Sequence, residues 1–89
     1  MRMADRIRET LAGALAPAEV TVTDDSGRHA GHAGNPDGAG ETHFSVEVVS
    51  PAFAGLSRVA RHRRVTDLLA AEFERGLHAL QLKLRAPGE

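Results

Sequence analysis

The fold of this chain is decided by the stretch ETHFSVEVV, residues 41–49. Within it, Phe44, Val46 and Val48 alternate with polar side chains. Strict alternation is typical of a strand that buries one face and exposes the other. The stretch therefore predicts a half-buried β-strand whose apolar face must be covered by other elements.

The residues that follow predict a helical turn and then a longer helix. Ser50 and Pro51 fit the N-cap and first position of a short turn that closes at Gly55. Ser57 can cap the longer helix, which Gly76 ends. The buried stripe expected on the longer helix consists of Val65, Leu68, Leu69 and Phe73.

A second alternation begins at His78, with Leu80, Leu82 and Leu84 in the same phase. It predicts another strand, which starts at His78 and ends before Pro87. A helix separates this strand from residues 41–49. If the two strands are adjacent, they therefore run parallel, joined by a right-handed crossover.

The upstream half of the chain predicts one more helix and one more strand. An apolar residue at every fourth position from Met3 to Leu15 indicates a helix of three to four turns, which Pro17 ends. Alternating valines indicate a strand over residues 18–25. Residues 26–40 hold five of the nine glycines without periodicity, so we expect a long loop that joins two antiparallel strands.

These elements fit one α+β domain over residues 1–89, with a three-stranded mixed sheet and covering helices in two layers. The chain has 11 Lys and Arg against 12 Asp and Glu, which excludes a strongly basic nucleic-acid wrapper. The absence of cysteine excludes disulfides, thiolate metal sites and a cysteine nucleophile. No nucleophile elbow or phosphate-binding glycine loop is present, so we do not expect an enzyme.

The sequence also lacks an apolar run of the roughly 20 residues that a membrane helix needs, and it lacks the apolar run of a secretory signal. We therefore expect a soluble, cytoplasmic protein without membrane contact.

Five histidines are the unusual feature of the composition. Parallel pairing would bring His78 to the end of the sheet where the long loop arrives, so His29, His32 and His43 can meet it there. Such imidazoles can bind a transition metal, whereas a half-buried structural role is the alternative for His78. His43 points away from the apolar face, which favours an exposed role or a bond to a neighbouring strand. His62 is expected at the edge of the core.

Four arginines crowd the start of the long helix, where cations oppose the helix dipole. They form either a solvated face that pairs with carboxylates or an anion patch for a partner protein or nucleic acid. These residues are Arg58, Arg61, Arg63 and Arg64.

Several stretches in a consistent order resemble the BolA family. They are Asp24-Asp25-Ser26, Gly40-Glu41-Thr42-His43-Phe44, Phe53-Ala54-Gly55, Arg61-His62-Arg63 and Leu77-His78-Ala79-Leu80. The resemblance implies a fold similar to the type II KH domain. It also implies a heterodimer with a monothiol glutaredoxin, bridged by a [2Fe-2S] cluster, and a link to stress-related regulation of transcription and morphology.

By the same resemblance, His78 matches the C-terminal cluster ligand of the family, and either His29 or His32 matches the ligand in the loop. The glutaredoxin and glutathione would supply sulfur, and no cluster is expected in the isolated chain. The alternative is a DNA-binding regulator that uses the arginine-rich helix, although the GXXG clamp of KH domains is absent. Homodimerisation of the free chain is left open.

Overall fold

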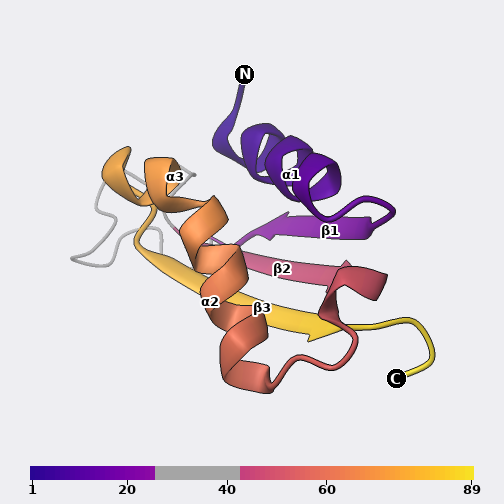
Figure 1. The fold of residues 1–89 in the computed structure, drawn as a ribbon. Coiled ribbons are helices and arrows are strands. Elements are labelled where there is room, and N and C mark those ends of the chain that lie inside the picture. The colour runs from indigo at the N-terminus through magenta and orange to yellow at the C-terminus, as the bar shows by residue number, and fades with distance from the viewer. Residues whose placement is uncertain (26–42) are drawn as a thin grey trace.

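The computed structural model describes residues 1–25 and 43–89. The fourfold spacing of apolar residues produces α1 (Met3–Ala14), which buries Met3, Ile7 and Leu11. This helix was predicted, and its place on one face of the sheet is seen in Figure 1. None of the helices in the described ranges is long and apolar enough to span a membrane.

The sheet contains β1 (Glu19–Asp24), β2 (His43–Val49) and β3 (Ala79–Arg85) in the order β1-β2-β3. β1 pairs with β2 in the antiparallel direction, and β3 pairs with β2 in the parallel direction. Both directions confirm the sequence prediction. The parallel register places His43 opposite Ala79, so the starts of β2 and β3 lie together.

Downstream of β2, the capping residues act as predicted. The Ser50 hydroxyl accepts the Ala52 N–H at the start of the 3-10 turn η2 (Pro51–Phe53), and the Ser57 hydroxyl accepts the Ala60 N–H at the start of α2 (Arg58–Leu68). The long helix expected after Ser57 is divided, because the chain leaves helical geometry at Leu69 before α3 (Ala70–Glu74).

One residue of the predicted stripe, Phe73, was wrong. Val65 and Leu69 are fully buried, but Phe73 remains 39% exposed. Glu72 is 4% exposed and takes the inward position on α3. Glu72 lies seven residues after Val65 and therefore close to the same helical face, and Arg6 on α1 pairs with it there.

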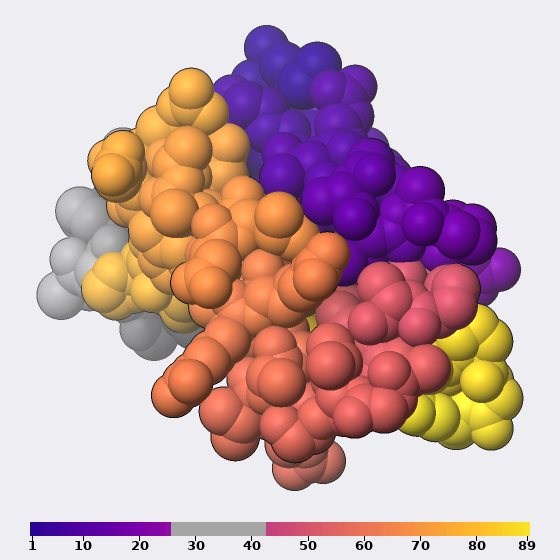
Figure 2. Space-filling model, viewed as in Figure 1, coloured from indigo at the N-terminus to yellow at the C-terminus, as the bar shows by residue number. Residues whose placement is uncertain are grey.

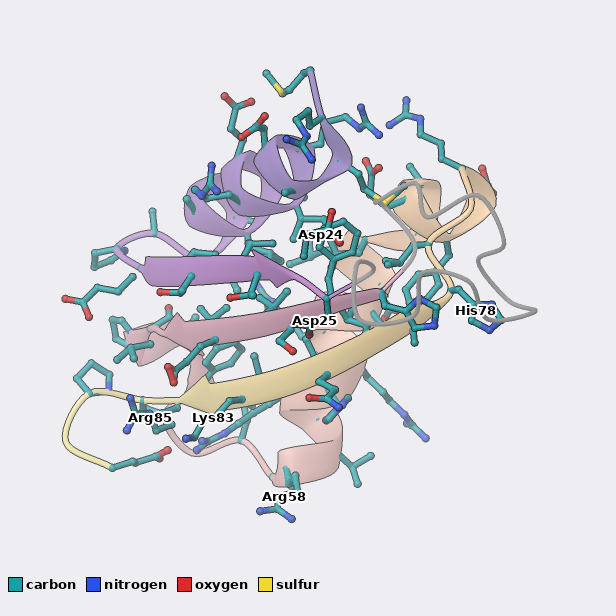
Figure 3. The ribbon with its side chains drawn as sticks, turned by 180° about the vertical axis from the view of Figure 1, so that it is seen from behind. Asp24, Asp25, Arg58, His78, Lys83 and Arg85 are labelled. Atoms are coloured by element: carbon teal, nitrogen blue, oxygen red, sulfur yellow. The ribbon has the colours of Figure 1, made fainter. Side chains whose placement is uncertain are left out.

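The core lies between the helices and one face of the sheet. Phe44, Val46 and Val48 from β2 pack there against α1, with Phe53 and Val65 completing the layer. Figure 2 shows how closely α1, α2 and the segment around η2 cover this face. None of the described helices covers the opposite face, which is turned toward the viewer in Figure 3. The prediction of an α+β fold with a mixed three-stranded sheet is therefore confirmed.

Candidate functional site

Two histidines meet where β2 and β3 begin. His43 is the first residue of β2, and His78 immediately precedes β3. Their ring centroids are 5.3 Å apart, and the ring planes are tilted by 59°. The parallel pairing therefore brings together two of the histidines that the sequence analysis placed at this end of the sheet.

His78 is more accessible than its sequence position suggested. We predicted that His78 begins the strand, with a half-buried structural role as the alternative to metal binding. In the structure β3 begins at Ala79 and His78 is exposed. The reason is that Leu77, which is 4% exposed, takes the buried position just before the strand, where its N–H donates to the Glu72 carbonyl at 3.0 Å. Within the described residues, the His78 ring makes no hydrogen bond or ion pair. A neutral imidazole displayed in this way can offer a nitrogen to a metal ion.

The predicted loop ligands His29 and His32 lie outside the described residues, as does the whole 26–40 loop. The structure does fix the residues at either side of the undescribed segment. The Asp25 N–H donates to the His43 carbonyl at 2.8 Å, so the described residues that flank the segment containing His29 and His32 are joined at the start of β2, the strand that neighbours β3. In the described ranges 1–25 and 43–89, no three His, Asp or Glu side chains are grouped so as to hold a metal ion.

A buried ion-pair network supports the segment that leads to His78. The Glu72 carboxylate accepts from Arg6 Nε at 3.1 Å and lies 3.0 Å from Arg6 Nη2, while Arg75 Nη1 donates to it at 3.0 Å. The network links α1 to α3, immediately before Leu77. Sequence reasoning missed Glu72, although its position seven residues after Val65 fits one helical stripe.

The four arginines of α2 separate into two kinds. Arg58, Arg63 and Arg64 are exposed. The Arg61 side chain is only 14% exposed, and its two terminal nitrogens donate to the Glu89 carboxylate at 2.5 and 2.7 Å. Its guanidinium also donates to the Leu56 carbonyl and to the Leu84 carbonyl.

These contacts change the acidity of the Glu89 carboxyl. The hydrogen bonds from Arg61 and from the Ala86 N–H lower the pKa of Glu89 to about 2, and the pKa of Arg61 is raised by its hydrogen bond to Glu89. The charge of Arg61 is thus compensated within the chain. Any anion patch on α2 therefore depends on Arg58, Arg63 and Arg64.

The prediction for His62 was wrong, because this side chain is exposed and not at the core edge. The first half of α2 passes over the outer strand β3 rather than over the centre of the sheet (Figure 1). One turn before Val65, the inward position of the helix is taken by Arg61, so the neighbouring His62 is turned toward solvent. His62 instead lines a groove beside β3.

Comparisons with known proteins agree with this architecture. The family described as BolA-like protein matches residues 11–89. The UV-induced protein uvi31 of Schizosaccharomyces pombe is 53% identical over 81 residues, which cover 88% of this chain and 78% of that protein. An uncharacterized protein of a Sinorhizobium species is 47% identical over 89 residues, covering 100% of this chain and 96% of its own.

The structure is also similar to solved structures from Arabidopsis thaliana. BolA1 matches with a TM-score of 0.84 and 44% identity over 98% of this chain and 94% of that chain. The BolA domain of SufE1 matches with a TM-score of 0.82 and 48% identity over 94% of this chain and 91% of that chain. The chain belongs to the family of BolA-like proteins.

Proposed function

We propose that this chain is a binding module that pairs with a monothiol glutaredoxin and co-ligates a [2Fe-2S] cluster through His78 and one loop histidine, His29 or His32. Its role would lie in iron-sulfur cluster handling or in regulation linked to iron and stress, not in catalysis. The cytoplasmic location expected from the sequence stays a prediction.

The observation that carries the proposal is the exposed His78 imidazole at the joined starts of β2 and β3. Leu77 and the buried Glu72 fix the backbone beside it, while the ring itself remains open to a partner. A ligand with a fixed backbone and an accessible ring loses little conformational freedom on binding a metal centre.

The donor chemistry of this site fits one iron of such a cluster. Imidazole nitrogens replace two thiolates on one iron of Rieske-type clusters, which shows that histidine is a competent ligand. The chain contains no cysteine, so every thiolate ligand must come from outside it. Both the histidine ligand and the external thiolates are present in a heterodimer with a glutaredoxin. This chain supplies the histidine, and the glutaredoxin with glutathione supplies the sulfur.

The experiment mixes the purified chain with a cluster-loaded monothiol glutaredoxin and records visible absorption and circular dichroism. We expect a heterodimer spectrum that differs from that of the glutaredoxin alone and that His78→Ala abolishes. His62→Ala is the matched control, because it removes another exposed imidazole that lies on α2. An unchanged spectrum for a folded His78→Ala variant would overturn the proposal.

The same assay decides between the two loop histidines. We expect one single substitution to cause a much larger spectral loss than the other. His32→Ala is expected to have the larger effect, because Gly31 and Gly34 give the backbone around His32 more conformational freedom. If His29→Ala and His32→Ala both had negligible effects on the spectrum, neither loop histidine would be a cluster ligand.

A second candidate function, DNA binding by a regulator, is supported by the three exposed arginines Arg58, Arg63 and Arg64 on α2. If Arg63 and Arg64 bind phosphates, replacing both with alanine should reduce the salt slope of DNA binding by about two units. Cluster-dependent pairing would instead depend on iron and glutathione, so a salt titration separates the two functions.

A further inference from the structure

A groove of about 670 Å³ runs between the first half of α2 and β3. Four consecutive residues of β3 line it, namely Leu82, Lys83, Leu84 and Arg85. Side chains of consecutive strand residues point to opposite faces, so a groove that meets all four must lie along the edge of the strand. β3 is an outer strand of the three described, and this edge is the one that does not face β2.

The backbone at this edge is oriented for pairing. The Arg85 carbonyl accepts the Ser50 N–H at 2.9 Å, on the side of β2, whereas the Leu84 carbonyl accepts from Arg61 at 3.2 Å, on the outer side. Backbone groups alternate sides along a strand, so the N–H and C=O of Leu82 also point outward. Outward groups on an edge strand are a template for an added strand.

The groove is also basic, although the whole chain has a net charge of −1. Arg58 stands on the helix side, and Lys83 and Arg85 stand on the strand side, at one end of the molecule in Figure 3. Glu89, which also lines the groove, is already paired with Arg61. The other three cations therefore leave an excess of positive charge.

The floor between these charges is apolar. Leu56, Leu82 and Leu84 line the groove and are only partly buried against the core. We propose that this groove binds an extended acidic segment of a partner protein, which adds as a strand to the edge of β3.

A peptide fits these features better than a nucleic acid does. An extended peptide can use the outward amide and carbonyl of Leu82, place apolar side chains on the leucine floor and direct carboxylates to Lys83 and Arg85. Single-stranded nucleic acid gains most from stacking on aromatic side chains, and the groove residues include no Phe, Tyr or Trp.

The groove is separate from the histidine end of the sheet. It begins at Leu82, four residues after His78, which corresponds to roughly 13 Å along an extended strand. An acidic segment and a glutaredoxin could therefore bind the chain together. Among the residues that the structure describes, no candidate cluster ligand lines the groove, so the groove proposal can be tested independently of the cluster proposal.

The test uses a fluorescein-labelled octapeptide of alternating Glu and Val, with a Gln and Val peptide as the uncharged control, and follows binding to the full chain by fluorescence anisotropy. We expect the acidic peptide to bind with an affinity that falls as salt rises. Combining Lys83→Ala with Arg85→Ala should weaken binding about tenfold, as expected for two partly exposed charge pairs. Combining Arg63→Ala with Arg64→Ala removes the same charge outside the groove and should change the affinity less than about twofold.

Amide exchange measured by NMR tests the strand addition itself. The acidic peptide should slow exchange of the Leu82 amide, since that N–H would donate to the added strand. Equal binding of the uncharged peptide, equal losses in the two double variants, or an unchanged Leu82 amide would overturn the proposal. Binding of single-stranded DNA that depends on Lys83 and Arg85, without binding of the acidic peptide, would also overturn it.

Discussion

Glu72→Gln tests the buried ion pair that holds α3, and with it the approach to His78, against α1. The substitution keeps the size of the side chain but removes its charge. The Glu72 side chain is 5% exposed, while that of Arg6 is 29% exposed. Loss of one partner of a buried ion pair costs roughly 3–5 kcal/mol, and partial rehydration of Arg6 lowers the expected cost to about 2–3 kcal/mol.

Urea unfolding followed by far-ultraviolet circular dichroism is the suitable assay, because the chain contains no Trp or Tyr for fluorescence. With a slope of about 1 kcal/mol/M for a small domain, the unfolding midpoint should fall by about 2–3 M. Asp5→Asn is the control, since the Arg8–Asp5 pair is 46% and 45% exposed and should contribute less than ~0.5 kcal/mol. Equal midpoints for the two variants would refute the assigned role of Glu72.

Three further substitutions test local features of the fold. Ser50→Ala should lower the free energy of unfolding by about 2 kcal/mol in the urea assay, because the buried hydroxyl donates to the Leu15 carbonyl at 2.6 Å and caps η2. A loss below about 0.5 kcal/mol would contradict this. Gly55→Ala should cost about 1 kcal/mol in the same assay, because Gly55 has a φ of 78°; an unchanged midpoint would show that the strain is relieved. Glu89→Gln should lower the thermal midpoint above pH 4.5 and lose its effect as the pH falls toward 2, since the lowered pKa of Glu89 stabilises the folded state only while the carboxylate is ionised in both states; a difference that persists at pH 2 would contradict the ion pair with Arg61.

The strands and their pairing could be predicted because their signals are local. Alternation in residues 41–49 identifies β2, and the intervening helix determines the parallel direction of β3. Together, these two predictions placed His78 next to the start of β2. This proximity is the geometric basis of the candidate site.

The errors arose where a distant residue determines the local structure. Glu72 is buried because Arg6 lies against it, and the two are 66 positions apart in the sequence. No helical pattern shows that partner, and a carboxylate is rarely chosen as an inward residue. For Arg61, the sequence left open pairing with a carboxylate or an anion patch, and only the structure identifies Glu89, 28 residues later, as the partner.

The position of His78 was wrong by one strand residue for a more local reason. Leu77 and Leu80 are both apolar and lie on either side of the start of the strand, so the sequence alone does not show which residue begins the alternation. In the structure, Leu77 is anchored by the Glu72 carbonyl, and β3 begins two residues later at Ala79.

Pulsed electron paramagnetic resonance of the reduced heterodimer tests whether His78 is a ligand of a shared cluster. Only this chain would carry ¹⁵N-labelled histidine, so any strong ¹⁵N coupling to the cluster must come from its own imidazoles. We expect such a coupling in the wild type and in His62→Ala, and its reduction or loss in His78→Ala. A wild-type heterodimer that holds the cluster without ¹⁵N coupling, or an unchanged coupling in His78→Ala, would show that His78 is not a cluster ligand.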